Sequence, residues 1–352
     1  MEEKVSIYIV GGTGYVSGEL IRLTLDHPHF SLKGVMSNSF AGETIKDHFS
    51  HLKHKLTKDQ KFLNFASLKQ AITTESKVTI LSAAPHGSTA KILEEIISLA
   101  NDHDIDLKIV DTSADFRFSD LATYEMLYEV KPLAHEIHQS FTCGIPEITQ
   151  DFTSRIAHPG CFSTSILLAM VPLLLLNDHQ DHFLVHSVTG SSGSGAAPKN
   201  NTHHPFRSEN FYAYSTLNHR HQFEIEDLVK HSYNREIQLD FLPHSGPFVR
   251  GIHSSISYRP QNKIDTTSIK KLFTDFYKDS YFVKILDTPP RIKDVAGTNY
   301  AEIYIEQQRG TIIVNCVIDN LIKGAAGGSI QWANKLNKID ESTGLLSASR
   351  GW

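Results

Sequence analysis

A glycine-rich turn near the N-terminus constrains the fold of this chain more than any other feature. The turn, Gly11–Gly18, follows an apolar run, Val5–Val10, and precedes a helical pattern over Glu19–Leu25. Leu32–Met36 is then typical of a second strand, which completes a strand–turn–helix–strand unit. Glycines let such a turn approach a pyrophosphate closely, and the helix N-terminus offers free N–H groups to the anion. The turn therefore predicts a dinucleotide-binding domain.

The strand pattern changes about half-way along the chain. Val78–Ala83 and Leu107–Val110 are buried-strand candidates that alternate with helices, as in a parallel sheet covered on both faces. After about residue 160 the strand-like runs lie closer together and indicate a mostly antiparallel sheet; they are Phe248–Tyr258, Phe282–Ile285, Tyr300–Gln307 and Thr311–Ile318. We predict an α/β protein with a Rossmann-type doubly wound parallel sheet plus a second α+β domain.

These patterns give three expected segments. Residues 1–160 form the nucleotide-binding domain, and residues 161–328 form a catalytic and dimerisation domain. Residues 329–352 are a C-terminal helix and tail that pack back on the first domain, with the helix over Ile330–Leu336.

Composition excludes several functional classes. The 352 residues carry 34 Lys+Arg against 39 Asp+Glu, a net charge of −5, which does not favour nucleic-acid binding. The acidic N-terminus is not that of a signal peptide, and the longest apolar run, Ile166–Leu176, is too short to span a bilayer. Three cysteines, an odd and sparse set, indicate a reduced, cytoplasmic setting. No metal site is expected, the pair His203-His204 included.

The end of the second strand indicates which dinucleotide binds. NAD-binding domains usually place an acidic residue there to hold the ribose hydroxyls. This chain instead has Ser37 and Asn38, which can donate hydrogen bonds to a 2′-phosphate without repelling it. We therefore expect NADP(H).

A cysteine in a sharp turn is the candidate nucleophile. Cys161 follows Pro159-Gly160 and precedes an apolar helix, for which Ser163, Thr164 or Ser165 is the expected cap. A helix N-terminus favours the thiolate, and its free N–H groups can stabilise an oxyanion. The alternative is a small buried residue in a turn, as expected of Cys316, which lies in an apolar strand.

The nucleophile needs an acid/base partner and an anion-binding group. His219 is the favoured partner, with His221 as the alternative or as a substrate ligand; alternation points both imidazoles the same way and Arg220 elsewhere. Arg117 and Arg250 are candidates to bind an anionic substrate, or else form structural salt bridges.

Taken together, these motifs resemble the N-acyl-γ-glutamyl-phosphate reductase family of arginine biosynthesis. The similar segments cover nearly the whole chain and include Gly11–Leu20, Ala84–Gly87, Asp111–Phe118, Gly144–Glu147, His158–Thr164, Thr189–Ala196, His219–His221, Pro243-His244, Arg250-Gly251, Gly297–Asn299 and Asp319–Gly327. The chain departs from the family pattern at Ser17, where a glycine is usual, at Asn38, where an arginine is common, and at Phe223, where a proline is usual.

The resemblance implies roles for particular residues. Cofactor contacts are expected from Gly11, Thr13, Gly14, Tyr15, Val16, Ser37, Asn38, Pro85, Ser192, Gly193 and Asn320. Substrate contacts are expected from Arg117, His221, Arg250 and Ser163, with Cys161 and His219 as catalytic residues. A homodimer or homotetramer is implied as well.

The implied reaction is the NADPH-dependent reduction of N-acetyl-γ-glutamyl phosphate to the 5-semialdehyde and phosphate. Cys161 would form a thioester, hydride would reduce it, and the thiohemiacetal would collapse. Four alternatives stay open: an N-succinyl substrate, an aspartate-semialdehyde dehydrogenase, an aminoadipyl-phosphate reductase, and a non-catalytic NADP-binding sensor.

Overall fold

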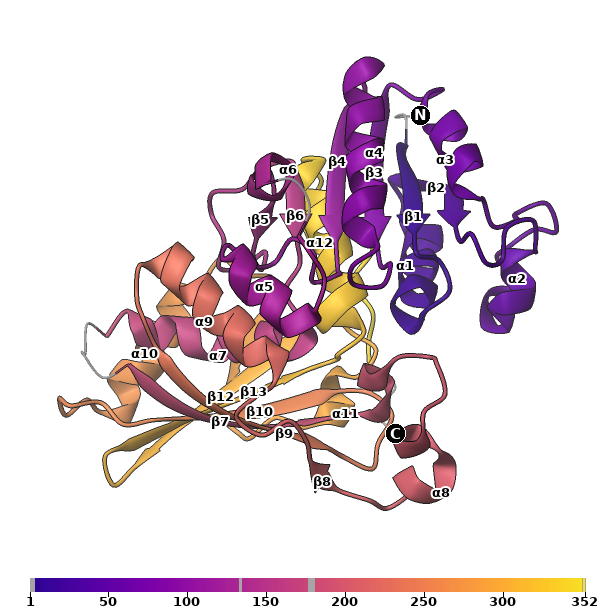
Figure 1. Ribbon diagram of the computed structural model, residues 1–352. Coiled ribbons are helices and arrows are strands. Elements are labelled where there is room, and N and C mark those ends of the chain that lie inside the picture. The colour runs from indigo at the N-terminus through magenta and orange to yellow at the C-terminus, as the bar shows by residue number, and fades with distance from the viewer. Residues whose placement is uncertain (1–3, 133–134, 177–180, 350, 352) are drawn as a thin grey trace. The chain divides into compact units, whose positions relative to one another are not determined.

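A six-stranded parallel sheet organises the first of two units into which the chain divides (Figure 1). The computed structural model describes residues 4–132, 135–176, 181–349 and 351. The first unit comprises residues 1–144, 151–158 and 326–345. Its strand order is β2-β1-β3-β4-β6-β5, from β1 (Val5–Val10), β2 (Phe30–Met36), β3 (Lys77–Ser82), β4 (Asp106–Asp111), β5 (Thr142–Cys143) and β6 (Arg155–Ala157).

Helices lie on both faces of this sheet. On one face, α1 (Tyr15–Asp26) contacts α12 (Gly327–Leu336), which also contacts β4. On the other face, α3 (Phe65–Ile72) and α4 (Thr89–Asp102) contact each other, β2 and β4. The remaining helices of this unit are short: α2 (Ile45–His48), η1 (Ser50–Leu52), α5 (Leu121–Tyr128) and α6 (His135–Gln139).

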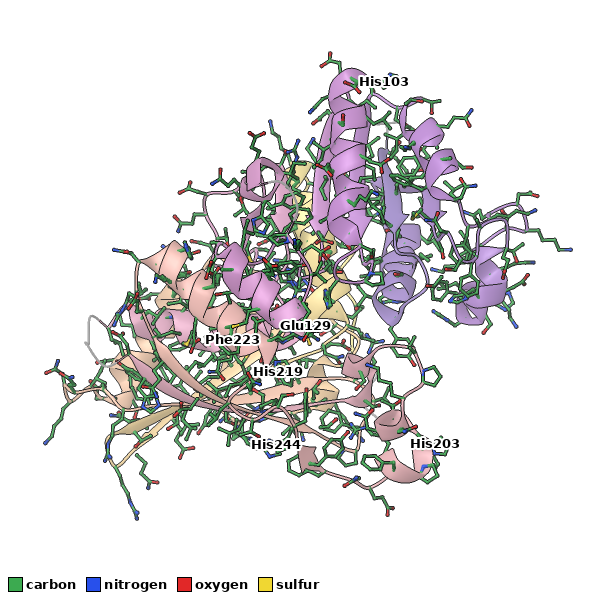
Figure 2. The ribbon with its side chains drawn as sticks, viewed as in Figure 1. His103, Glu129, His203, His219, Phe223 and His244 are labelled. Atoms are coloured by element: carbon green, nitrogen blue, oxygen red, sulfur yellow. The ribbon has the colours of Figure 1, made fainter. Side chains whose placement is uncertain are left out.

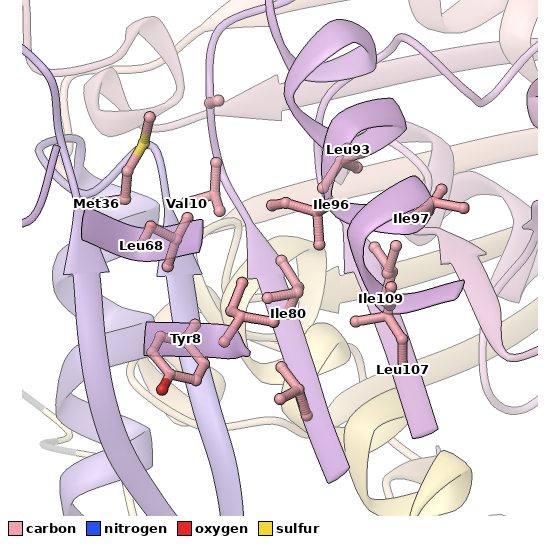
Figure 3. Close-up of a cluster of buried hydrophobic side chains, with 14 of the residues drawn as sticks. Tyr8, Val10, Met36, Leu68, Ile80, Leu93, Ile96, Ile97, Leu107 and Ile109 are labelled. Carbon is pink, nitrogen blue, oxygen red and sulfur yellow. The ribbon is translucent and has the colours of Figure 1, made fainter. Parts of the chain in front are cut away.

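The core beneath α3 and α4 is mostly aliphatic (Figure 3). Ile80 and Ile109 of the central strands and Leu93 and Ile96 of α4 are all fully buried. Each such side chain contributes roughly 1.5–3 kcal/mol through removal from water. The strands therefore carry continuous apolar runs, as expected of a parallel sheet that is covered twice.

A seven-stranded mixed sheet forms the second unit, which comprises residues 145–150, 159–325 and 346–352. Its strand order is β11-β12-β13-β10-β7-β9-β8, and only β11–β12 and β7–β9 pair in parallel among the described residues. The strands are β7 (His182–Thr189), β8 (Tyr212–Ala213), β9 (Gln238–Ser245), β10 (Ile252–Tyr258), β11 (Val283–Leu286), β12 (Ala301–Gln308) and β13 (Thr311–Ile318).

Three helices cover one face of the mixed sheet (Figure 1). Here α7 (Cys161–Leu174) contacts β10 and β13, α9 (Arg220–Tyr233) contacts β9, and α10 (Thr266–Phe276) contacts β12. Alternate residues of β7, β9 and β10 are buried, so each strand turns one side toward these helices. The short helices are η2 (Ser191–Ser194), η3 (Asn200–Thr202), α8 (His204–Arg207), α11 (Ile292–Val295) and a π-helical turn, η4 (Ile322–Ala326).

The predicted fold class is confirmed. The two sheets have the predicted parallel and mostly antiparallel character, and the expected strands are present with ends shifted by a few residues. Strands β7 and β9, in which exposed or half-buried residues alternate with buried ones, were not assigned from the sequence.

Candidate active site

Cys161 is the first residue of α7, so the helix begins a few residues earlier than the sequence predicted. The N-cap is Gly160, and no side chain caps this end of the helix. The amide groups of the first turn are therefore not consumed by a capping side chain, which leaves them able to meet a negative charge. The thiol of Cys161 is partly exposed.

The expected caps are wrong. The helix begins at Cys161, so Thr164 already closes the first turn, and its hydroxyl donates back to the Gly160 carbonyl at 3.0 Å. Ser165 donates to Ser254 Oγ at 2.9 Å instead. Ser163 is fully buried, and its hydroxyl has no hydrogen-bond partner in the part of the chain that the structure describes.

A buried carboxylate holds the turn before the cysteine. Glu224 of α9 is fully buried, and its Oε1 accepts a hydrogen bond of 2.6 Å from the Gly160 amide. The negative charge lies at the N-terminal end of α7, where the helix dipole favours it. This bond couples the start of α7 to α9, the helix that carries the two histidines.

The two imidazoles lie together at the start of α9. His219 is the N-cap, and its Nδ1 accepts a hydrogen bond of 3.1 Å from the His221 amide. The rings of His219 and His221 meet edge to face with centroids 4.8 Å apart, and Figure 2 shows His219 at this end of the helix. A Cβ on Gly160 would come within 2.2 Å of His221 Nε2, so this imidazole lies directly against the residue that precedes Cys161.

Burial keeps His219 neutral. Removal from water, reinforced by the positive charge of Arg220, lowers the pKa of His219 to about 4, although Glu224 acts in the opposite direction. Because Nδ1 accepts the His221 amide, the neutral ring carries its proton on Nε2. At neutral pH this imidazole is therefore a hydrogen-bond donor through Nε2.

Tyr214 belongs to the same cluster and was not found from the sequence. Its ring lies 5.6 Å from that of His219. Burial, followed by the negative charge of Cys161, raises the pKa of Tyr214, which keeps its hydroxyl protonated. The cluster around the cysteine thus contains two imidazoles and a phenol.

Arg250 is held by a buried carboxylate. Its Nε and Nη2 donate to the two oxygens of Asp319 at 3.0 and 3.1 Å. Asp319 also accepts hydrogen bonds from the backbone amides of Gly297, Leu321 and Ile322.

The turn that follows Asp319 touches the cysteine. Lys323, in the π-helical turn, pairs with Glu147, and both side chains are buried. A Cβ on the next residue, Gly324, would lie 2.7 Å from Cys161 Cβ. The absence of a side chain at Gly324 is what allows this turn to pack against the cysteine.

Three residues expected to contact the cofactor lie in this second unit. Asn320 donates to Ser192 Oγ at 3.0 Å and accepts the Gly251 amide at 2.8 Å. Gly193 follows Ser192 in the same loop. Asn320 therefore holds the loop that contains Ser192 and Gly193 against the start of β10.

The glycine-rich turn lies between β1 and α1 in the first unit. Gly11 has φ +79°, and a Cβ there would come within 2.3 Å of the Ala84 backbone, so only glycine fits. Gly14 is the N-cap of α1, and a Cβ there would meet nothing within 4 Å. No acidic side chain lies in the first turn of α1. The amides of Tyr15 and Val16 thus begin a helix whose end is open to an anion.

Ser37 and Asn38 follow β2 in the first unit. Asn38 Oδ1 accepts the Phe65 amide at 3.0 Å, while the side chain itself is exposed. Because the Phe65 amide occupies the side-chain oxygen of Asn38, the Nδ2 group of this exposed side chain remains as the donor. A 2′-phosphate would require such a donor.

The remaining predicted residues also lie in the first unit. Arg117 is buried and donates to the Thr112 carbonyl at 2.6 Å. Pro85 begins the turn before α4, where its carbonyl accepts the Ser88 hydroxyl at 2.8 Å. The predicted residues are thus divided between the two units.

Neither a metal cluster nor a membrane span is found in the described residues. No three His, Cys, Asp or Glu side chains are grouped there so as to bind a metal ion. Across residues 4–132, 135–176, 181–349 and 351, no helix combines the length and the apolarity needed to cross a bilayer.

Family models match each half of the chain. Residues 6–155 match the model described as semialdehyde dehydrogenase, NAD binding domain. Residues 161–320 match semialdehyde dehydrogenase, dimerisation domain. The second match begins at Cys161.

Curated relatives are similar over nearly the full length. The N-acetyl-gamma-glutamyl-phosphate reductase of Desulforudis audaxviator is 35% identical over 97% of this chain and 98% of its own. That of Aquifex aeolicus is 32% identical over 98% of both chains. The chain belongs to the N-acetyl-gamma-glutamyl-phosphate reductase family.

Solved structures place this member of the reductase family in a wider fold group. Aspartate semialdehyde dehydrogenase II from Vibrio cholerae, complexed with ASA, superposes with a TM-score of 0.69 over 96% of this chain and 99% of its own. The Candida albicans enzyme with NADP gives 0.67 over 95% and 99%. Sequence identity is 14% in both cases, so these comparisons show a shared fold.

Three residues around the site of this reductase-family chain escaped sequence reasoning. Glu224 lies one helical turn after His221, which was an available signal. Asp319 directly follows an apolar strand, which was a second signal in the sequence. Tyr214 follows the aromatic residues Phe211 and Tyr212 in a segment without a recognisable motif, and only the tertiary structure brings it to His219.

Proposed function

We propose that this chain catalyses the NADPH-dependent reduction of N-acetyl-γ-glutamyl phosphate to N-acetyl-glutamate 5-semialdehyde and phosphate, a step of arginine biosynthesis. The observation that carries the proposal is Cys161 at the open N-terminus of α7, beside the imidazoles of His219 and His221. The activity named for the relatives has the same chemical requirement: a nucleophile that can displace phosphate from an acyl group.

The first unit fits a dinucleotide phosphate. The open space at Gly14, the uncapped start of α1 and the lack of an acidic first turn suit a pyrophosphate. Ser37 and Asn38 offer donors rather than a carboxylate after β2, which supports NADP(H) over NAD(H). When bound, NADPH supplies the hydride that reduces the thioester.

Cys161 performs the acyl transfer. Its thiolate attacks the γ-carbonyl carbon, a C–S bond forms, and the bond to the phosphate oxygen breaks with the electron pair leaving on phosphate. The product is a thioester, and the amides at the start of α7 are placed to stabilise the oxyanion of this step. After reduction, the thiohemiacetal C–S bond breaks and sulfur leaves as thiolate.

We assign different tasks to the two histidines. His219, with a pKa near 4 and its proton on Nε2, donates a hydrogen bond to substrate oxygen. His221, which lies against Gly160, exchanges the proton with sulfur and with the thiohemiacetal hydroxyl. The sequence favoured His219 for the proton transfer; its low pKa supports His221 instead.

The anionic substrate needs cationic partners. Asp319 fixes the orientation of Arg250, and we propose this guanidinium as a contact for the carboxylate or phosphate of the substrate. We propose Arg117 and Ser163 as further substrate contacts, with the cofactor contacts of Pro85, Ser192, Gly193 and Asn320 as expected from the sequence.

We also propose a homodimer in a reduced, cytoplasmic compartment. The mixed sheet has helices on one face, and the family model that matches this unit is described as a dimerisation domain. A homotetramer is the alternative, and light scattering behind size exclusion distinguishes them. The compartment must keep Cys161 reduced for the mechanism to operate.

The test is phosphate-dependent oxidation of N-acetyl-glutamate semialdehyde with NADP, against NAD in parallel. Cys161→Ser is expected to lose at least ~10³-fold in kcat, because a hydroxyl is a far weaker nucleophile, while the Kd for NADPH stays within about twofold. Substantial turnover by Cys161→Ser would contradict the proposal.

The same assay separates the alternatives. Run side by side on N-succinyl-glutamate, aspartate and aminoadipate semialdehydes, it is expected to give the highest kcat/KM with the N-acetyl-glutamate compound. No turnover with any semialdehyde, together with NADPH binding, would favour the sensor instead.

A further inference from the structure

Arg207 is a charged side chain that is buried, although its aromatic neighbour in the same helix is exposed. It belongs to α8, a single turn over His204–Arg207, and it is the buried residue of that turn. The guanidinium side chain is 8% exposed, whereas the neighbouring Phe206 is 49% exposed. Charged side chains are almost never buried unless they are paired, so a cation inside and an aromatic ring outside require a reason.

The guanidinium is incompletely satisfied. Its Nη2 donates to the backbone carbonyl of Gly246. Its Nη1 is buried and has no hydrogen-bond partner among the described residues. In the same part of the chain no carboxylate forms an ion pair with it. A buried cation with a spare donor is strongly unfavourable unless an anion completes it.

Arg250 provides the contrast within the same unit. Both arginines are attached to one loop: Arg207 bonds the carbonyl of Gly246, and Arg250 lies four residues further on. The carboxylate of Asp319 neutralises the charge of Arg250, whereas Arg207 donates only to an uncharged backbone carbonyl. The positive charge of this loop region is therefore concentrated at Arg207.

The surroundings of Arg207 connect it to the cysteine cluster. The guanidinium lies 5.8 Å from the ring centroid of Tyr212, two residues before Tyr214. The charges of Arg207 and Cys161 act on the Tyr214 hydroxyl with opposite signs. Tyr214 thus lies within electrostatic reach of both groups, and its ring contacts His219.

We propose that Arg207 forms an oxyanion-binding site, for a carboxylate or phosphate group of the substrate, beside the Cys161–His219–Tyr214 cluster. This inference rests on the proposed function for its ligand. The planar guanidinium supplies Nη1 as donor while the Gly246 carbonyl fixes its orientation. Because Nη1 is buried, binding of the anion requires a small displacement of this one-turn helix, whose other residues are exposed.

The experiment compares wild type with Arg207→Gln in the phosphate-dependent direction, where the two oxyanions are separate co-substrates. Loss of one charge-assisted contact is expected to raise one KM by about 10- to 100-fold. A rise in the KM for inorganic phosphate assigns the site to the phosphoryl group. A rise in the KM for the semialdehyde assigns it to the α-carboxylate.

Arg259→Gln is the matched control. That guanidinium lies in the same unit, is exposed, and also bonds a backbone carbonyl, that of Arg309. Both KM values are expected to stay within about twofold of wild type in this variant. Arg207→Lys keeps the cation but loses the planar fork, so the same KM should rise by a smaller factor.

Direct titration keeps the test independent of turnover. Inorganic phosphate and N-acetyl-glutamate are titrated calorimetrically into wild type and Arg207→Gln, and one Kd is expected to rise with the corresponding KM. If wild type lacks the proposed activity, these titrations alone decide the Arg207 site. Unchanged KM and Kd values for both anions in a folded Arg207→Gln protein would overturn the inference. Should that variant not fold, unchanged values in Arg207→Lys would overturn it equally.

Discussion

Glu224 accepts the amide hydrogen of Gly160 at 2.6 Å, although 64 residues separate the two in sequence. The bond fixes the backbone immediately before Cys161 from a helix that also carries His219 and His221. A hydrogen bond from a backbone N–H to a buried carboxylate is stronger than one to a neutral acceptor, because the acceptor is charged and the protein interior screens the attraction little. The position of the nucleophile thus depends on a carboxylate that does no chemistry itself.

Replacement of Glu224 is expected to impair catalysis by displacing Cys161. In Glu224→Ala the buried Gly160 amide loses its partner, at a cost of about 1–3 kcal/mol in unfolding free energy. We expect kcat to fall by about 10- to 100-fold with little change in the KM for NADP. Glu224→Gln keeps an acceptor oxygen and should recover most of the loss. Urea unfolding and steady-state kinetics check both, and equal defects in the two variants would contradict a positioning role.

The two histidines should respond differently to the same substitution. Asn is a good N-cap, so His219→Asn keeps the cap of α9 and should cost at most about 1 kcal/mol in stability. A group with a pKa near 4 does not titrate between pH 5.5 and 8, so any pH dependence of kcat in that range should persist in His219→Asn.

His221→Asn is expected to reduce kcat more than His219→Asn, by about 10²- to 10⁴-fold as for loss of a general base. The measurement is the pH profile of kcat for both variants and wild type. A larger loss in His219→Asn, with a changed profile, would return the proton transfer to His219.

Much of the fold follows from the sequence because its signals are local. The continuous apolar runs that became β1 and β3, and the glycines between β1 and α1, reflect burial and backbone conformation at those very positions. Cys161 was singled out as a candidate for the same reason, since Pro159-Gly160 ends one segment and precedes a helix.

What the sequence did not reveal depends on contacts between distant segments. The Glu224–Gly160 and Arg250–Asp319 bonds join residues 64 and 69 positions apart. The wrong caps have a local cause: Ser163 and Thr164 are typical N-cap residues, yet the turn ends early enough for Gly160 to take that position.

Gly324→Ala is expected to disturb Cys161 directly. The added Cβ would lie 2.7 Å from Cys161 Cβ, closer than two carbon atoms can approach, so one of the two segments must move. The rate of Cys161 alkylation by iodoacetamide and kcat should both change, with kcat falling at least about tenfold, while NADPH still binds. Gly310→Ala is the control: Gly310 has a positive φ in the β12–β13 turn, so it tests loss of stability away from the cysteine. Normal kcat in Gly324→Ala would show that the turn relaxes without affecting the site.

His27 should make the first unit sensitive to acid. Its Nδ1 accepts the His29 amide and its Nε2 lies 3.1 Å from the Thr343 carbonyl, so the neutral ring donates through Nε2 to the segment after α12. Burial, the largest cause, lowers the pKa of His27 from 6.5 to about 4. Protonation must place a hydrogen on Nδ1 and break the bond to His29.

The sign follows from proton linkage. Between pH 6.5 and about 4 the unfolded chain binds a proton at this residue and the folded chain does not, so stability is fully present above pH 6.5 and falls as the pH is lowered. The loss should reach about 2–3 kcal/mol near pH 4. His27→Gln removes this titration, so its unfolding free energy should be lower than wild type at pH 7.5 and decline less between pH 7.5 and 4.5. Urea unfolding at several pH values measures the difference, and parallel curves for the two proteins would show that His27 does not contribute.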